Sequence, residues 1–420
     1  MHICVIGAGV IGLTAAYFLQ SEGHNVTIIE RDNGVGQGAS AANGAQLSYA
    51  FVAPLADASV PPRLPSLFLT RDSPLKLHFR ADPLQWRWAV QFLRHANAAD
   101  ARATTAGLLK LAELSREFIE PLIEGEGIDC HFTRGGKLVV YPDARSLAAA
   151  QAQVLYQSGL GTRQTVLTRA ECIAQEPALE PYENRIAGGV WTGSDAAADC
   201  GEFCAQLAQR IVQRGGDLQL NRTVRGFDVE PRAGESAVRA LITEQGSLRA
   251  DAYLLAAGIG ARELGASAGL MLPIYPLKGY SITVKPVGEM APLQASITDA
   301  RRKVVFAPLG DRVRVAGFVE IGATDNSIPP ARISALLDAA REVLGYSIID
   351  GDVRPWAGQR PATPSGRPII GRTPMTNLYL SVGHGALGWT LAAGSARLIC
   401  DAVAGRAPTI DVRPYLYRLN

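Results

Sequence analysis

A glycine-rich segment close to the start of the chain constrains the fold more than any other feature. It follows an apolar run at 3–6 and precedes a helical pattern from 10 to about 22. The first glycine of such a unit makes a tight turn, the second admits a pyrophosphate, and the third lets the helix pack on the sheet. The helix N-terminus then faces the phosphates. The segment predicts a Rossmann-type dinucleotide site formed by Gly7, Ala8, Gly9, Val10, Ile11 and Gly12.

A second apolar run at 26–29 ends in a carboxylate, Glu30, with Arg31 beside it. A carboxylate at the end of the second strand of a dinucleotide-binding unit accepts the ribose hydroxyls. We therefore expect Glu30 and Arg31 to contact the adenosine half of the cofactor. The glycine motif does not by itself distinguish NAD from FAD, so the choice depends on segments further along the chain.

Three later segments indicate a larger, flat cofactor. A run of small and amide side chains at 40–46 is suited to wrapping such a ligand, and an apolar strand near 253–257 ends in Ala257 and Gly258. The third segment, at 383–390, combines a glycine turn with a helix start, whose partial positive charge stabilises a reduced flavin. The remaining expected cofactor contacts are Ser40, Ala41, Ala42, Asn43, Gly44, Gln46, Val224, Gly358, Gly383, His384, Gly385, Leu387, Gly388, Trp389 and Thr390.

Composition and charge exclude several other classes. The chain has 41 Lys+Arg against 39 Asp+Glu, a net charge of +2, which lacks the basic footprint of a nucleic-acid-binding protein. Its six cysteines include no CxxC pair, so we expect reduced thiols, no metal and a cytoplasmic protein. The chain begins without a cationic leader, and no apolar run reaches the ~18 residues of a membrane span.

The hydrophobic pattern predicts a mixed α/β fold with two domains. Besides the first strand–helix–strand unit, helices are expected at 84–96, 103–124, 200–213, 331–344 and 388–404. Strands are expected at 137–141, 187–191, 218–230, 275–284, 303–307, 312–319 and 378–382. Alternation along 312–319 indicates a half-buried antiparallel sheet. No strand is expected in the Pro/Gly-rich stretch 355–374.

The motifs together resemble one enzyme family. The segments IGAGVIG, SAANGAQ, YPLKGYS (275–281), GQRPATPSGRPIIG (358–371) and GHGALGWT are similar, end to end, to those of the FAD-dependent D-amino acid dehydrogenases. This family lies within the D-amino acid oxidase and glycine oxidase superfamily. The resemblance implies noncovalent FAD in a discontinuous Rossmann-type domain, here 1–50, 185–265 and 350–420. It also implies an antiparallel-sheet substrate domain, here 51–184 and 266–349.

The resemblance also implies the chemistry. Members of the family oxidise an amino acid by hydride transfer from its α-carbon to flavin N5, and water converts the imino acid to a 2-oxo acid and ammonia. Electrons then pass to a quinone or another non-oxygen acceptor. Because geometry and flavin electronics do most of this work, no dedicated protein base is required.

Four side chains are expected at the reacting centre. Arg360 resembles the arginine of the family's G-x-R-P motif, which pairs with the substrate carboxylate, a task that suits its planar fork. Tyr280 is expected to help hold that carboxylate, unless it only packs the strand. Tyr49 is expected in a lid, and His384 against the flavin or substrate, unless its contacts are purely structural.

Several alternatives fit the sequence as well. The enzyme could instead be an oxidase or dehydrogenase for glycine, D-proline, hydroxyproline or another secondary amine, or the chain could be a flavin subunit that only relays electrons. A third alternative is an NAD-dependent dehydrogenase. Trp86 and Trp88 on either side of Arg87 suggest either core packing or attachment to the cytoplasmic face of the membrane.

Overall fold

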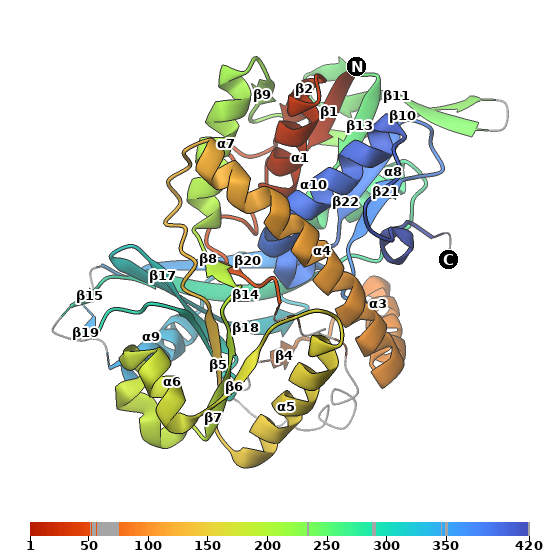
Figure 1. Ribbon diagram of the computed structural model, residues 1–420. Helices are drawn as coiled ribbons and strands as arrows, with labels where there is room; N and C mark the ends of the chain where they lie inside the picture. Colours follow the sequence, from red (N-terminus) through yellow and green to blue (C-terminus); the bar gives the residue numbers. More distant parts are fainter. Residues whose placement is uncertain are drawn as a thin grey trace.

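Two large β-sheets organise the chain. The computed structural model describes residues 1–50, 52, 56, 75–232, 235–287, 291–345, 347–348 and 352–418. One sheet has six strands and the other nine, and Figure 1 shows them in separate halves of the molecule. The fold is therefore mixed α/β, as the sequence predicts.

The six-stranded sheet is mainly parallel and contains the predicted strand–helix–strand unit. Its spatial order is β21 (Ile369–Arg372), β22 (Leu378–Val382), β13 (Ala252–Leu255), β1 (His2–Ile6), β2 (Asn25–Ile29) and β9 (Asp217–Gln219). Only β21 runs antiparallel to its neighbour. The central strands are buried, which explains their continuous apolar sequences.

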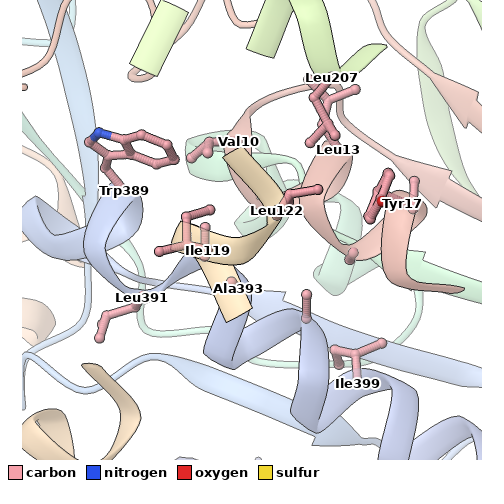
Figure 2. Close-up of a cluster of buried hydrophobic side chains, with 14 of the residues drawn as sticks. Val10, Leu13, Tyr17, Ile119, Leu122, Leu207, Trp389, Leu391, Ala393 and Ile399 are labelled. Carbon is pink, nitrogen blue, oxygen red and sulfur yellow. The ribbon is translucent and has the colours of Figure 1, made fainter. Parts of the chain in front are cut away.

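Four of the described helices share one core on a face of this sheet. They are α1 (Val10–Ser21), α4 (Ala98–Gly125), α7 (Cys200–Gln213) and α10 (Gly388–Ala404). Figure 2 shows how side chains from all four converge, including Leu13 of α1, Ile119 of α4, Leu207 of α7 and Leu391 of α10. Helix α4 therefore belongs with the Rossmann-type half in space, although it lies in the stretch 51–184 that we assigned to the substrate domain.

The nine-stranded sheet is mostly antiparallel. Its order is β20 (Arg354–Ala362), β14 (Tyr275–Val284), β18 (Arg312–Ile321), β17 (Val304–Leu309), β16 (Ser296–Asp299), β5 (Lys137–Tyr141), β7 (Gly188–Thr192) and β6 (Thr165–Thr168), with β4 (Leu75–Leu77) beside β18. One face packs on α9 (Pro330–Leu344) and on α6 (Arg169–Gln175). The opposite face meets the loop that follows β2, because Ser281 Oγ donates to the Ala42 carbonyl at 2.6 Å.

Smaller elements complete the fold. A three-stranded sheet contains β10 (Val224–Arg232), β11 (Glu235–Thr243) and β12 (Gly246–Leu248), and two short pairs join β3 (Gln46–Leu47) to β8 (Ala196–Ala197) and β15 (Pro286–Val287) to β19 (Ser347–Ile348). The other α-helices in the described part of the chain are α3 (Pro83–His95), α5 (Ala144–Ser158) and α8 (Ala261–Ser267).

The main error in the predicted elements is β20, where no strand was expected. The strand contains Pro355 and Pro361, which cannot donate to a sheet ladder. It is nevertheless compatible with the sheet because β20 is an edge strand, where proline is tolerated. Strands β7 and β20 both lie in the nine-stranded sheet, so the expected boundaries at 185 and 350 do not coincide with the sheets. The strand expected at 218–230 is two strands, β9 and β10.

A buried arginine ties the two halves together. Arg314 of β18 donates to Thr283 Oγ1 at 2.7 Å, to the Asn43 carbonyl at 2.8 Å and to Asp199 Oδ2 at 2.7 Å. Asp199 in turn accepts from the Gly201 amide at 2.8 Å at the N-terminus of α7. One guanidinium thus joins the antiparallel sheet, the loop after β2 and a helix of the Rossmann-type half.

Replacing Arg314 by Met should destabilise the protein by about 3 kcal/mol, because it leaves the enclosed Asp199 carboxylate without its counter-charge. Chemical denaturation monitored by tryptophan fluorescence measures this loss. Arg312→Gln, on the same strand, is the matched control because its pair with Asp352 is partly exposed and should contribute about 1 kcal/mol or less. Equal stabilities of the two variants would contradict the role given to Arg314.

Candidate active site

The glycine motif has the close contacts that a dinucleotide-binding turn requires. Gly7 has φ +106°, and a Cβ there would lie 2.7 Å from the Ala256 carbonyl oxygen at the end of β13. A Cβ on Gly12 would lie 1.9 Å from the Gly7 carbonyl oxygen. Any side chain at either position therefore displaces backbone, so α1 can approach β1 this closely only with glycine.

Glu30 and its neighbours border this turn. One carboxylate oxygen of Glu30 accepts from the Ala8 amide at 2.7 Å, and the other accepts from the Asp32 amide at 3.1 Å. The Arg222 amide donates to the Glu30 carbonyl at 2.8 Å, which brings the start of β10, with Val224, to the same edge. Arg31 is exposed, and its Nε lies 3.7 Å from Asp32 Oδ1.

The loop at 40–46 connects the glycine motif to the N-terminus of α10. At its start, Ser40 Oγ accepts from the Val10 amide at 3.1 Å. Just beyond its end, the Ser48 amide donates to Thr390 Oγ1 at 3.0 Å. Residues 41–44 and Gln46 remain half-exposed along this path. The two glycine-rich regions, about 370 residues apart in the chain, are thus linked by one continuous segment.

The turn before α10 adopts the predicted glycine conformation. Gly383 has φ +77° and Gly385 has φ +56°. Trp389 donates from Nε1 to the Ala198 carbonyl at 3.1 Å, which fixes the start of α10. Leu387 and Gly388, between the turn and Trp389, stay half-exposed.

His384 lies in this turn but is buried, with Nε2 3.0 Å from Ser395 Oγ. Burial lowers the pKa of the imidazole to about 3, so the ring is neutral at physiological pH. The backbone of His384 pairs with Ala362 of β20, which brings the turn within two residues of Arg360. The buried, neutral ring of His384 is suited to holding the turn in place rather than to transferring a proton.

Arg360 faces the same side of the nine-stranded sheet as Leu277 and Ser281, which is the side that meets the 40–46 loop. Its Nη1 donates to the Phe318 carbonyl at 3.2 Å. Among the residues that the structure describes, no carboxylate forms an ion pair with it. Desolvation lowers the pKa of the guanidinium to about 10, although part of its surface is accessible. A partly accessible cation at this depth is suited to binding an anion. Gly358 lies two residues away on the same face.

Tyr280 lies on the opposite face, so our expectation that it joins Arg360 is not met. Strand alternation places it with Lys278, whose Nζ is 5.4 Å from the tyrosine ring, and it packs in the core beneath α9. Burial raises the pKa of its hydroxyl. Tyr49 is 3% exposed and packs in the core of the Rossmann-type half. That position does not provide a lid surface.

Sequence reasoning missed three polar side chains on the loop-facing side of the sheet. Ser281 and Arg314 hold the carbonyls of Ala42 and Asn43, as described above. Lys137 of β5 is 5% exposed and donates from Nζ to Ser48 Oγ at 2.8 Å, and desolvation lowers its pKa to about 8. Alternation along β5 and along β18 separates Lys137 and Arg314 from the apolar face of each strand. Nothing in the sequence shows that the loop is their partner.

Gly12→Ala should prevent retention of the expected FAD, because the methyl group overlaps the Gly7 carbonyl and forces α1 away from the turn. The ratio of flavin absorbance to protein absorbance after purification measures this. Gly38→Ala is the control, since a Cβ there meets nothing within 4 Å. A Gly12→Ala protein as yellow as the wild type would refute the assignment of this turn.

Comparisons with known proteins identify the family. A family model described as FAD dependent oxidoreductase matches residues 2–402. The chain is 43% identical to D-amino acid dehydrogenase 2 of Ralstonia nicotianae, with 99% of each chain covered. It is also 43% identical to D-amino acid dehydrogenase 2 of Pseudomonas aeruginosa, covering 99% of this chain and 98% of that one.

Solved structures show the same fold. Glycine oxidase from Geobacillus kaustophilus superimposes with a TM-score of 0.77 at 23% identity, covering 100% of this chain and 98% of that one. L-proline dehydrogenase from P. horikoshii gives 0.73 at 18% identity, with 99% and 96% covered. Together with the family model, these similarities confirm the resemblance found in the motifs: the chain belongs to the family of FAD dependent oxidoreductases.

Proposed function

We propose that this FAD-dependent enzyme oxidatively deaminates D-amino acids to 2-oxo acids and ammonia. Two relatives with 43% identity over almost their whole length are D-amino acid dehydrogenases, which supports this substrate class. The observation that carries the proposal is Arg360, a deeply placed guanidinium without an ion-pair partner among the described residues, next to the C-terminal glycine turn.

The residues present fit FAD. A cofactor site needs residues that stay accessible between packed elements, and most of the expected contacts have this property. Those that remain half-exposed are Gly7, Gly9, Ile11, Glu30, Ala41, Ala42, Asn43, Gly44, Gln46, Val224, Ala257, Gly258, Gly385, Leu387 and Gly388. Those that are buried are Ala8, Val10, Gly12, Ser40, Gly358, Gly383, His384, Trp389 and Thr390. Gly9 caps α1 without a side chain, which leaves the helix N-terminus open to a phosphate. The 40–46 loop and the start of α10 would then border the flavin.

Arg360 binds and orients the substrate in this proposal. Its two-pronged donor set matches a carboxylate, and partial desolvation strengthens the pairing. Bound FAD supplies the two-electron acceptor for the α-hydrogen. The chain itself contributes position rather than proton transfer: His384 is neutral and engaged with Ser395. Orientation of this kind contributes several kcal/mol to a barrier.

Arg360→Ala should lower kcat/KM for D-amino acids by about a hundredfold or more, because the substrate carboxylate loses its counter-charge. Arg354→Ala is the control, since Arg354 is exposed at the other end of β20. The measurement is anaerobic mixing with a panel of D- and L-amino acids, glycine and cyclic imino acids, followed by bleaching of the oxidised flavin band.

The same panel separates the alternatives. Reduction by glycine or by secondary amines, but not by D-amino acids that have a side chain and a primary amine, would favour an oxidase or dehydrogenase for glycine or a secondary amine. No reduction by any substrate would favour an electron-relay subunit. Reduction that is unchanged in Arg360→Ala would contradict the site, and Tyr280→Phe tests separately whether the far-face hydroxyl contributes.

We further propose that the enzyme attaches peripherally to an anionic membrane and passes electrons to a quinone there. Support comes from α3, where Trp86, Val90 and Leu93 form an exposed stripe, with Trp86 stacked on the exposed Phe79 at 5.5 Å. Trp88 of the same helix points inward and donates to the Ala362 carbonyl at 2.9 Å.

Charge around the stripe is complementary to acidic lipid. The exposed cations beside it are Arg80, Arg87 and Arg94, and Asp82 is the one acidic residue between His78 and His95. The Asp82 side chain caps α3. An apolar stripe with a tryptophan and flanking arginines is typical of helices that lie in a membrane interface. Within the described part of the chain, no helix is both long and apolar enough to span a bilayer.

The protein should sediment with vesicles that contain phosphatidylglycerol and less with pure phosphatidylcholine, since each arginine near an anionic surface contributes about 1 kcal/mol. Trp86→Asp combined with Leu93→Asp should abolish the binding, whereas Leu155→Asp, at a site that is 75% exposed on α5, should not. Equal sedimentation of all three proteins would refute this surface.

Reoxidation of the reduced enzyme by a quinone analogue, compared with air, tests the acceptor.

A further inference from the structure

We propose that Gly279 and Phe318 form a seat that fixes the orientation of the Arg360 guanidinium. They are positioning residues, because neither is expected to touch the substrate. The inference rests on the proposed function, since it takes Arg360 as the residue that binds the substrate carboxylate. It adds a reason why that arginine can bind a carboxylate in one defined geometry.

Gly279 provides the floor of the seat. It lies in β14 on the same face as Arg360, opposite Gly358 of β20. A Cβ on Gly279 would lie 2.3 Å from Nη2, 2.5 Å from Cζ and 2.8 Å from Nη1 of Arg360. These three atoms of the guanidinium are thus close to the same point, which places the group directly over the glycine. Only a residue without a side chain leaves this space free.

Phe318 provides the wall. The register of β14 against β18 passes from Lys278 opposite Glu320 to Tyr280 opposite Gly317, so Phe318 and Val319 together face Gly279. This irregularity is a β-bulge, a device that redirects groups next to functional sites. Phe318 has φ +63°, a conformation that side-chain-bearing residues rarely adopt, and its carbonyl accepts from Arg360 Nη1 at 3.2 Å.

Contacts on the opposite face of the sheet hold the bulge in place. The Arg332 guanidinium lies 4.8 Å from the centre of the Phe318 ring. Arg332 is itself fixed, because its Nε donates to Glu320 at 2.8 Å. The ring of Phe318 is therefore held on the α9 side of the sheet, while its carbonyl accepts from Arg360, whose side chain lies on the other side. Strain that is held by surrounding structure in this way is characteristic of functional sites.

The seat has a consequence for binding. One donor of Arg360 is occupied by a backbone carbonyl. The guanidinium lies over Gly279, where β14 has no side chain that could displace it. The orientation of the remaining donors is then set before a carboxylate arrives. Ordering a long side chain in advance lowers the entropic cost of binding.

The first test uses Gly279→Ala in the holoenzyme. The probe is benzoate, a carboxylate that has no α-hydrogen to react, and its Kd is measured from the change in flavin absorbance. The methyl group should displace the guanidinium and raise the Kd on the order of tenfold, with FAD content unchanged. Gly125→Ala is the control, because a Cβ there meets nothing within 4 Å. In an Arg360→Gln background, Gly279→Ala should have a much smaller effect, because the glutamine side chain ends before the position of Cζ and does not reach the space over the glycine.

A second test does not depend on whether Gly279→Ala folds. Phe318→Val and Phe318→Gly both remove the ring, but only glycine tolerates positive φ, whereas a β-branched residue resists it. Phe318→Val should turn the carbonyl away from Arg360 and raise the benzoate Kd on the order of tenfold above that of Phe318→Gly. Equal Kd values for this pair would overturn the role of the bulge.

The outcomes distinguish the seat from the proposed function. If no D-amino acid reduces the flavin of the wild type, the proposed function fails. If D-amino acids reduce it but Arg360→Ala changes neither benzoate binding nor flavin reduction, the assignment of Arg360 as the carboxylate-binding residue fails, and the seat fails with it. If Arg360→Ala abolishes both, while Gly279→Ala and Phe318→Val bind benzoate as the wild type does, the proposed function stands and the seat is refuted.

Discussion

The buried contacts of Arg314 are the interaction on which the arrangement of the site depends. The antiparallel sheet carries Arg360, whereas the Rossmann-type half carries the glycine motif, so the proposed site requires that these two units are fixed relative to each other. Arg314 spans them by bonding Thr283 on its own sheet, the Asn43 carbonyl in the loop and Asp199 at α7. All its hydrogen-bonding nitrogens have acceptors, so its charge can be buried at tolerable cost.

Arg360 represents the opposite case, a deep guanidinium that the described part of the chain leaves without a counter-charge. Such a group is costly in the empty enzyme, and that cost becomes useful when an anion arrives. The contrast with Arg314 on the same sheet is informative. Arg314, which joins the two halves, is paired with the Asp199 carboxylate. Among the described residues, the hydrogen-bond acceptor of Arg360 is the neutral Phe318 carbonyl, which leaves the charge available to an anionic ligand.

Much of the Rossmann-type half could be predicted from sequence because its signals are local. The glycine motif, the strand 378–382 and the helix 388–404 follow from residues adjacent in the chain. The strand that carries Arg360 could not be predicted, since Pro355 and Pro361 contradict a strand unless it lies at a sheet edge. Tyr280 shows a different limit: strand alternation places it on one face with Lys278, but alternation alone does not identify the face that meets the 40–46 loop.

Two strained residues show how the site gains its rigidity. Ala45 in the 40–46 loop and Phe318 in the bulge both have positive φ, at 55° and 63°, where glycine would be unstrained. Each is held by hydrogen bonds from other elements: the Ala45 carbonyl accepts from the Ala198 amide at 2.9 Å, and the Phe318 carbonyl accepts from Arg360. Glycine at either position would relieve about 1 kcal/mol of strain but would let the backbone sample other conformations. A side chain restricts that freedom, so local strain is tolerated where a backbone carbonyl is held in one direction, by the Ala198 amide in one case and by Arg360 in the other.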